Sequence, residues 1–128
     1  MKCSIQNTGA EVADAEVHLL RNGGVSGFAR SPDTLNTGQN SGFQALNLVF
    51  HSGAAIAVLL GYDMKYADNG QRSHWHEGHP MKVPEQWYRQ HYAAHFRTIG
   101  ECGMRILNAS RDTLLDCFPR VTIEEALA

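Results

Sequence analysis

The run Ala54-Ala55-Ile56-Ala57-Val58-Leu59-Leu60, followed by Gly61-Tyr62-Asp63, decides the fold class. It is a continuous apolar stretch of strand length, without the polar alternation of a strand that has one solvated face. Strands with this pattern are covered on both faces, as the central strands of parallel sheets are. Residues 54–60 are therefore predicted to form a central parallel strand that ends at Gly61.

Helices and strands are predicted to alternate on both sides of this strand. Apolar spacing, capping boxes beginning at Thr8 and Thr122, and glycine stops place helices over residues 9–21, 42–52, 85–102, 110–117 and from 122 onward. Further strands are predicted at 2–6, 25–29 and 104–108, and residues 30–40 and 64–83 have loop composition. This alternation predicts a small Rossmann-like α/β fold, a mostly parallel sheet of about four strands with helices on both faces.

Composition excludes several classes of protein. The chain has 128 residues and 43% hydrophobic content, which fits one domain over residues 1–128. A formal net charge of −2 and the lack of a basic run argue against a nucleic-acid partner. No apolar run is long enough to span a bilayer, no secretory signal is visible, and the cysteines are odd in number. We therefore expect a cytoplasmic protein with reduced thiols and no membrane partner.

The turn Thr37-Gly38-Gln39-Asn40-Ser41-Gly42 immediately precedes the helix predicted at 42–52. Helix N-termini offer unpaired N–H groups and a partial positive charge, so a phosphate or carboxylate is the expected ligand here. The two glycines would let a ligand approach the backbone, and Asn40 and Ser41 add side-chain donors. The alternative is an ordinary capped helix start, because the pattern is neither a P-loop nor G-x-G-x-x-G.

The loop after the central strand contains Ser73-His74-Trp75-His76-Glu77-Gly78-His79. Histidines that titrate near neutral pH suit general acid–base chemistry, and Trp75 can stack on a ligand ring. Metal binding, with His91 and His95 of the next helix, is the weaker interpretation because the spacing matches no zinc pattern. A solvated loop remains the alternative, above all for His76 and Glu77.

Two of these segments resemble a known group of proteins. The stretch from Thr37 to Leu48, together with Ile56 to Met64, resembles phage and prophage proteins. Those proteins are similar to bacterial sialyltransferases and to the pterin pyrophosphokinase-like (motility accessory) domain family. The segment 73–79 is similar to the sialyltransferase Ser-His-aromatic-x-Gly-His pattern, and Asn108-Ala109-Ser110 resembles the family's closing strand and turn. The resemblance covers about residues 35–125 and implies that His79 is the general base.

The resemblance implies a nucleotide or nucleotide-sugar as the small-molecule partner, without a further cofactor or a metal. The expected ligand-binding residues are Thr37, Gly38, Asn40, Ser41, Gly42, Asp63, His74, Trp75, Asn108 and Ser110. The family's nucleotide-holding front loop is shortened here to Ile5–Gly9. We therefore expect a nucleotide-binding protein that sequesters a host signalling nucleotide, in the host cytoplasm if the chain is phage-encoded.

Two other functions are weighed beside sequestration. The first is a glycosyltransferase in which His79 deprotonates an acceptor hydroxyl, and the second is a virion-associated structural protein without an active site. A small parallel sheet leaves exposed edges, and the helix 85–102 presents Trp87, Tyr88 and Tyr92, so a homo-oligomer is expected.

Overall fold

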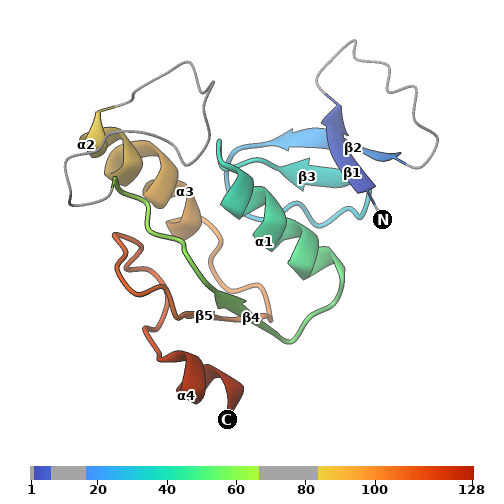
Figure 1. The fold of residues 1–128 in the computed structure, drawn as a ribbon. Coiled ribbons are helices and arrows are strands. Elements are labelled where there is room, and N and C mark those ends of the chain that lie inside the picture. The colour runs from blue at the N-terminus through green and yellow to red at the C-terminus, as the bar shows by residue number, and fades with distance from the viewer. Residues whose placement is uncertain (1, 7–16, 67–83) are drawn as a thin grey trace.

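The computed structural model describes residues 2–6, 17–66 and 84–128 (Figure 1). The elements follow one another as β1 (Lys2–Gln6), β2 (Val17–Gly24), β3 (Thr34–Asn36), α1 (Ser41–His51), β4 (Ile56–Leu59), α2 (Glu85–Trp87), the π-helical segment η1 (Tyr88–Ala93), α3 (Ala94–Arg97), β5 (Arg105–Asn108) and α4 (Ile123–Leu127). The chain is thus a mixed α/β protein, as the alternating pattern predicts.

The apolar run at 54–60 forms β4, and its pairing is parallel as predicted. β4 pairs with β5 in a register that runs from Ile56 opposite Arg105 to Leu59 opposite Asn108. A parallel pair needs a long crossover, and the helical segments within 84–97 belong to that connection. The carboxyl ends of β4 and β5 therefore lie side by side.

The described strands form two small parallel sheets where one sheet was expected. β1, β2 and β3 make the first sheet, and β4 and β5 make the second. The predicted helix is wrong over residues 17–21, because that segment lies in β2 and pairs with β1 and β3. The predicted strand at 25–29 is also wrong, and the expected loop at 30–40 contains β3.

The apolar spacing at Val17, Leu19 and Leu20 fits a helix and a strand equally, and long-range pairing decides between them. The Asn22-Gly23-Gly24 sequence is not a helix stop. It shifts the register of β2 against β3, and Gly24 takes a φ of 129°, which favours glycine.

The helices after β3 agree better with the sequence. Asn40 caps α1 by accepting a hydrogen bond from the Phe43 N–H, and Gly53 follows the helix with a φ of 76°. The capping box of Thr122 and Glu125 forms at the start of α4 as predicted. The helix expected at 85–102 ends earlier, at Arg97, and the one expected at 110–117 is wrong because that segment is a series of turns.

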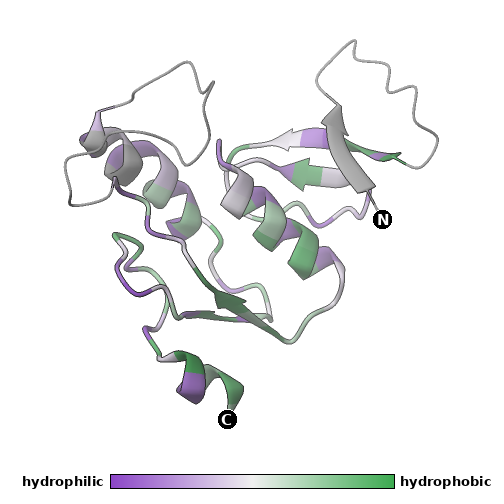
Figure 2. Ribbon diagram, in the orientation of Figure 1, coloured by the Kyte–Doolittle hydropathy of each residue, from purple (hydrophilic) through white to green (hydrophobic). Residues whose placement is uncertain are grey.

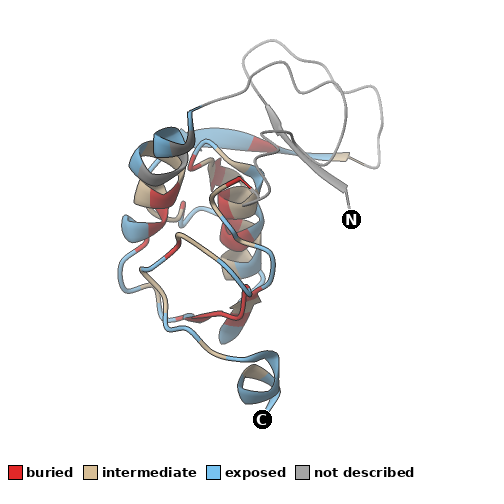
Figure 3. Cartoon of the chain, turned by 60° about the vertical axis from the view of Figure 1, so that its left-hand side comes forward, coloured by how far each residue is buried: buried red, intermediate tan, exposed pale blue. Residues whose placement is uncertain are grey.

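The core lies where α1 and α3 pack on one face of the β4–β5 pair. The Phe96 ring is central, since its centroid lies 5.3 Å from that of Phe43, 6.0 Å from Tyr62 and 6.3 Å from Phe118. Figure 2 shows that β4 and the second half of α1 are predominantly hydrophobic. Figure 3 shows buried residues concentrated in these elements, whereas the helix at the C-terminus is exposed or intermediate. This packing fixes the loops that follow β4 and β5.

None of the helices in the described ranges is long and apolar enough to cross a membrane.

Candidate functional site

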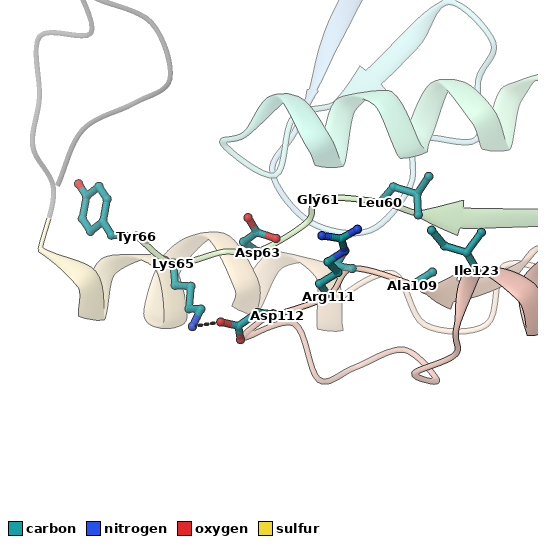
Figure 4. A pocket seen from close by; sticks show the side chains of 10 residues that line it. Leu60, Gly61, Asp63, Lys65, Tyr66, Ala109, Arg111, Asp112 and Ile123 are labelled. Atoms are coloured by element: carbon teal, nitrogen blue, oxygen red, sulfur yellow. Dashed lines mark ion pairs between the residues drawn. The ribbon is translucent and has the colours of Figure 1, made fainter. Parts of the chain in front are cut away.

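A pocket of about 440 Å³ opens at the carboxyl ends of β4 and β5 (Figure 4). Ligands of open parallel sheets bind outside this end of the strands, so the pocket lies where the fold class predicts a site. Its lining comes from the two loops after the strands and from the start of α4, and consists of Leu60, Gly61, Asp63, Lys65, Tyr66, Ala109, Ser110, Arg111, Asp112 and Ile123.

Hydrogen bonds tie the two loops of the pocket to each other. The N–H of Tyr62 donates to Oγ of Ser110 at 2.9 Å, and Oγ1 of Thr113 donates to the carbonyl of Tyr62 at 2.5 Å. The N–H of Leu114 donates to the carbonyl of Asp63 at 2.8 Å. Because these contacts join residues about 50 positions apart in sequence, they hold the loop after β4 in a fixed position against the loop after β5.

Hydrogen bonds from Asn108 and Arg120 also fix the conformation of the loop after β5. Asn108 is fully buried; its Nδ2 donates to the Leu115 carbonyl at 3.1 Å and its Oδ1 accepts the Ser110 N–H at 3.1 Å. Nη2 of Arg120 donates to the carbonyls of Ser110 and Arg111 at 2.8 and 3.2 Å. The Asn108 side chain therefore shapes the pocket through the backbone, and its predicted contact with a ligand stays a prediction.

Four charged side chains from the described residues line the pocket, and two of them form an ion pair with each other. Lys65 is mostly buried and pairs with the more exposed Asp112. The side chains of Asp63 and Arg111 are exposed, and within the described residues they form no hydrogen bond or ion pair. In Figure 4 they point to one side of the loops, and Lys65 and Asp112 point to the other. The pocket thus offers one carboxylate and one guanidinium to a ligand.

Ser110 adds a buried hydroxyl to the pocket wall. The residue is 2% exposed and its Oγ accepts the Tyr62 N–H, but in the described part of the chain its own O–H donates no hydrogen bond. Its O–H can therefore donate to a ligand that enters the pocket. Leu60 and Ile123, 57% and 46% exposed, supply an apolar wall beside these groups (Figure 4).

Many polar groups of the turn at 37–42 are hydrogen-bonded to other groups of the protein. Gly38 and Gln39 both have positive φ values, 51° and 57°, and the Asn40 N–H donates to the Thr37 carbonyl at 3.1 Å, as in a type I′ turn. Asn40 also donates from Nδ2 to the Gly38 carbonyl at 3.0 Å, and the Thr37 hydroxyl donates to the Gly24 carbonyl at 3.3 Å. Ser41 is exposed at the start of α1.

The two glycines of this turn make room for aromatic side chains of the protein. A Cβ on Gly38 would lie 2.2 Å from Cγ of Phe43, and a Cβ on Gly42 would lie 2.9 Å from the Tyr62 ring. The Tyr62 hydroxyl donates to the Gly42 carbonyl at 3.0 Å. Burial raises the pKa of Tyr62, which keeps this hydroxyl protonated as a donor. Tyr62 therefore connects the start of α1 to the pocket loops.

The predicted site residues fall into three groups in the structure. Asp63 and Ser110 line the pocket, and the buried Asn108 lies beside it, where its Oδ1 accepts the Ser110 N–H. The 37–42 turn lies outside the pocket lining and reaches it through Tyr62. His74, Trp75 and His79 lie outside the described residues, so their predicted roles are untested by the structure.

The sequence interpretation missed Lys65, Arg111 and Asp112. All three follow a strand end within six residues, which is the signal that could have found them. Ser110, the neighbour of Arg111 and Asp112, was the last residue of this loop that the sequence interpretation included.

The two histidines near the π-helical segment form a separate group. The His91 ring lies against Trp87, with centroids 4.0 Å apart and the ring planes tilted by 37°. Burial, followed by the charge of His91, lowers the pKa of His95. Across residues 2–6, 17–66 and 84–128, no three His, Cys, Asp or Glu side chains gather in a way that could hold a metal ion.

Comparisons of the chain with protein-family models, curated proteins and solved structures each found no match. The resemblance to sialyltransferase-like phage proteins therefore stays a prediction from the motif residues.

Proposed function

We propose that this protein binds a nucleotide or nucleotide derivative in the pocket at the carboxyl ends of β4 and β5. The observation that supports this most is that the Arg111 guanidinium and the Asp63 carboxylate line one pocket, on loops bonded to each other, and neither has a side-chain partner among the described residues. A guanidinium binds phosphate oxygens in a bidentate manner, and a carboxylate accepts hydrogen bonds from hydroxyl or amino groups. A nucleotide presents both kinds of group.

The proposal treats β4, the helical segments within 84–97 and β5 as one unit of a Rossmann-like fold. In such units the ligand lies outside the carboxyl ends of the strands. A volume of about 440 Å³ is within the range of small-molecule pockets, roughly 300–1,000 Å³, and suits a single nucleotide.

Isothermal titration of the purified chain with ribonucleoside 5′-monophosphates and 5′-diphosphates tests the proposal. We expect at least one of them to bind, and Arg111→Ala to weaken that binding about 10-fold or more, since charged hydrogen bonds contribute about 1.5–3 kcal/mol. Arg105→Ala is the matched control, because Arg105 is exposed at the opposite end of β5. The proposal is wrong if no nucleotide binds, or if Arg111→Ala binds as tightly as the unchanged chain.

Sequestration and turnover are separated by recovering the ligand. Denaturing the complex and identifying the released molecule by mass spectrometry should return the nucleotide unchanged if the protein sequesters it. A cleaved nucleotide-sugar would instead favour the glycosyltransferase prediction, which depends on His79.

Self-association also stays a prediction from the sequence, and light scattering tests it.

A further inference from the structure

Asp63 occupies a distinctive position in the pocket. It is the first acidic residue after β4, its backbone carbonyl is fixed by the Leu114 N–H at 2.8 Å, and its side chain is exposed. The carboxylate forms no ion pair with Arg111, which lines the same pocket. Two opposite charges held on tied loops without pairing leave room for a ligand that satisfies both.

We infer, on the basis of the proposed function, that the ligand is a ribonucleotide whose 2′,3′-diol binds Asp63 and whose phosphate binds Arg111. An ionised carboxylate only accepts hydrogen bonds, through two oxygens, and a cis-diol presents two O–H donors at matching spacing. The reverse orientation is disfavoured because it places the phosphate against the Asp63 carboxylate, and like charges repel.

The surrounding contacts favour a preorganised diol site. The residue before Asp63, Tyr62, is held at its N–H by Ser110 and at its carbonyl by Thr113. The residue after Asp63, Met64, has a φ of 54°, an uncommon conformation for a non-glycine residue that clusters at functional sites. Met64 packs partly buried against the core, which holds the backbone in that conformation.

The other charged pair of the pocket is less suited to this role. Asp112 is already paired with Lys65, so a ligand hydroxyl would have to compete with an ammonium group for its oxygens. Asp63 has no such competitor among the described residues. The diol is therefore assigned to Asp63, and the Lys65–Asp112 pair borders the site.

The test compares sugars on the unchanged protein. The four ribonucleoside 5′-monophosphates are titrated beside their 2′-deoxy and 3′-deoxy counterparts by isothermal titration. We expect either deletion to weaken binding about 10- to 100-fold, because each removes a hydrogen bond to a charged acceptor. Asp63→Asn should abolish the preference for ribose, whereas Glu101→Gln, an exposed carboxylate outside the pocket, should preserve it.

The outcomes separate the inference from the proposed function. Equal binding of ribonucleotides and both deoxynucleotides would overturn the assignment of the diol to Asp63 while leaving nucleotide binding intact. Failure of every nucleotide to bind would overturn the proposed function, and the inference with it. The comparison of sugars needs no substitution, so it stays decisive even if Asp63→Asn fails to fold.

Discussion

Replacing Gly38 with alanine tests whether the 37–42 turn needs a glycine there to leave space for the buried Phe43 ring. Gly38 is buried with a φ of 51°, and an added Cβ would lie 2.2 Å from Cγ and 2.5 Å from Cδ2 of Phe43. Phe43 is fully buried between Phe28 and Phe96, so its ring has little room to move away. The left-handed backbone costs about 1–2 kcal/mol for a residue with a Cβ, and overpacking a core costs about 1–3 kcal/mol more. We expect the free energy of unfolding to fall by about 2–5 kcal/mol.

Gly53→Ala is the matched control. Gly53 has a similar backbone conformation, with a φ of 76°, but an added Cβ would meet no heavy atom within 4 Å. It should therefore show only the backbone cost, about 1–2 kcal/mol. Urea denaturation followed by circular dichroism measures both variants. Equal losses for the two substitutions would refute the conclusion that Gly38 is required by its packing against Phe43.

Three further predictions concern buried polar and titratable groups. Asn47→Ala should lower the free energy of unfolding by about 2–4 kcal/mol, because the fully buried Asn47 Oδ1 accepts hydrogen bonds from two backbone N–H groups. A decrease in that free energy of less than about 1 kcal/mol in urea denaturation would contradict this. The lowered pKa of His95 means that the neutral ring stabilises the fold above its ordinary pKa, and this contribution is lost as the pH falls through the lowered value. The free energy of unfolding should therefore fall less between about pH 7 and pH 5 in His95→Gln than in the unchanged chain. If the urea midpoint falls equally with pH in both proteins, this prediction is wrong. Burial raises the pKa of Cys117 from 9.0 to about 11. Iodoacetamide should therefore alkylate Cys117 on the order of 100-fold more slowly at pH 8 in the folded chain than in the unfolded chain. Mass spectrometry measures both rates, and equal rates would contradict this prediction.

Local signals predicted β4, β5 and the start of α4. The run 54–60 became β4 because its residues are apolar and of strand length, and the predicted strand at 104–108 became β5. The capping box at Thr122 begins α4 because its side-chain oxygen satisfies an otherwise unpaired N–H at the start of the helix. These features depend on neighbours within a few residues, so a single sequence contains them.

The first sheet was not predictable in the same way. The spacing of Val17, Leu19 and Leu20 fits two periodicities, and the choice depends on pairing with β1 and β3. Thr34–Asn36 is too short and polar to give a strand signal, yet it pairs with β2. Tertiary pairing here overrides the local preference.

The sequence predicted the location of the candidate site better than it predicted the residues that line the pocket. Asp63 and Ser110 were both expected to bind the ligand, and the structure brings them into one pocket. Arg111 was missed although it follows β5 by three residues, and the hydrogen bond that Asn40 accepts from the Phe43 N–H depends on cap geometry that only the structure shows. Sequence alone does not reveal whether a polar group is already satisfied.

The most direct test of nucleotide binding at this pocket is a map of the amide signals of the ¹⁵N-labelled chain during titration with the ribonucleotide that binds. We expect the largest chemical-shift changes at residues 60–65 and 109–112, which form the loops of the pocket. Changes concentrated at residues 37–42 would place the ligand at the start of α1 and contradict the account, and so would the absence of any change with every ribonucleotide.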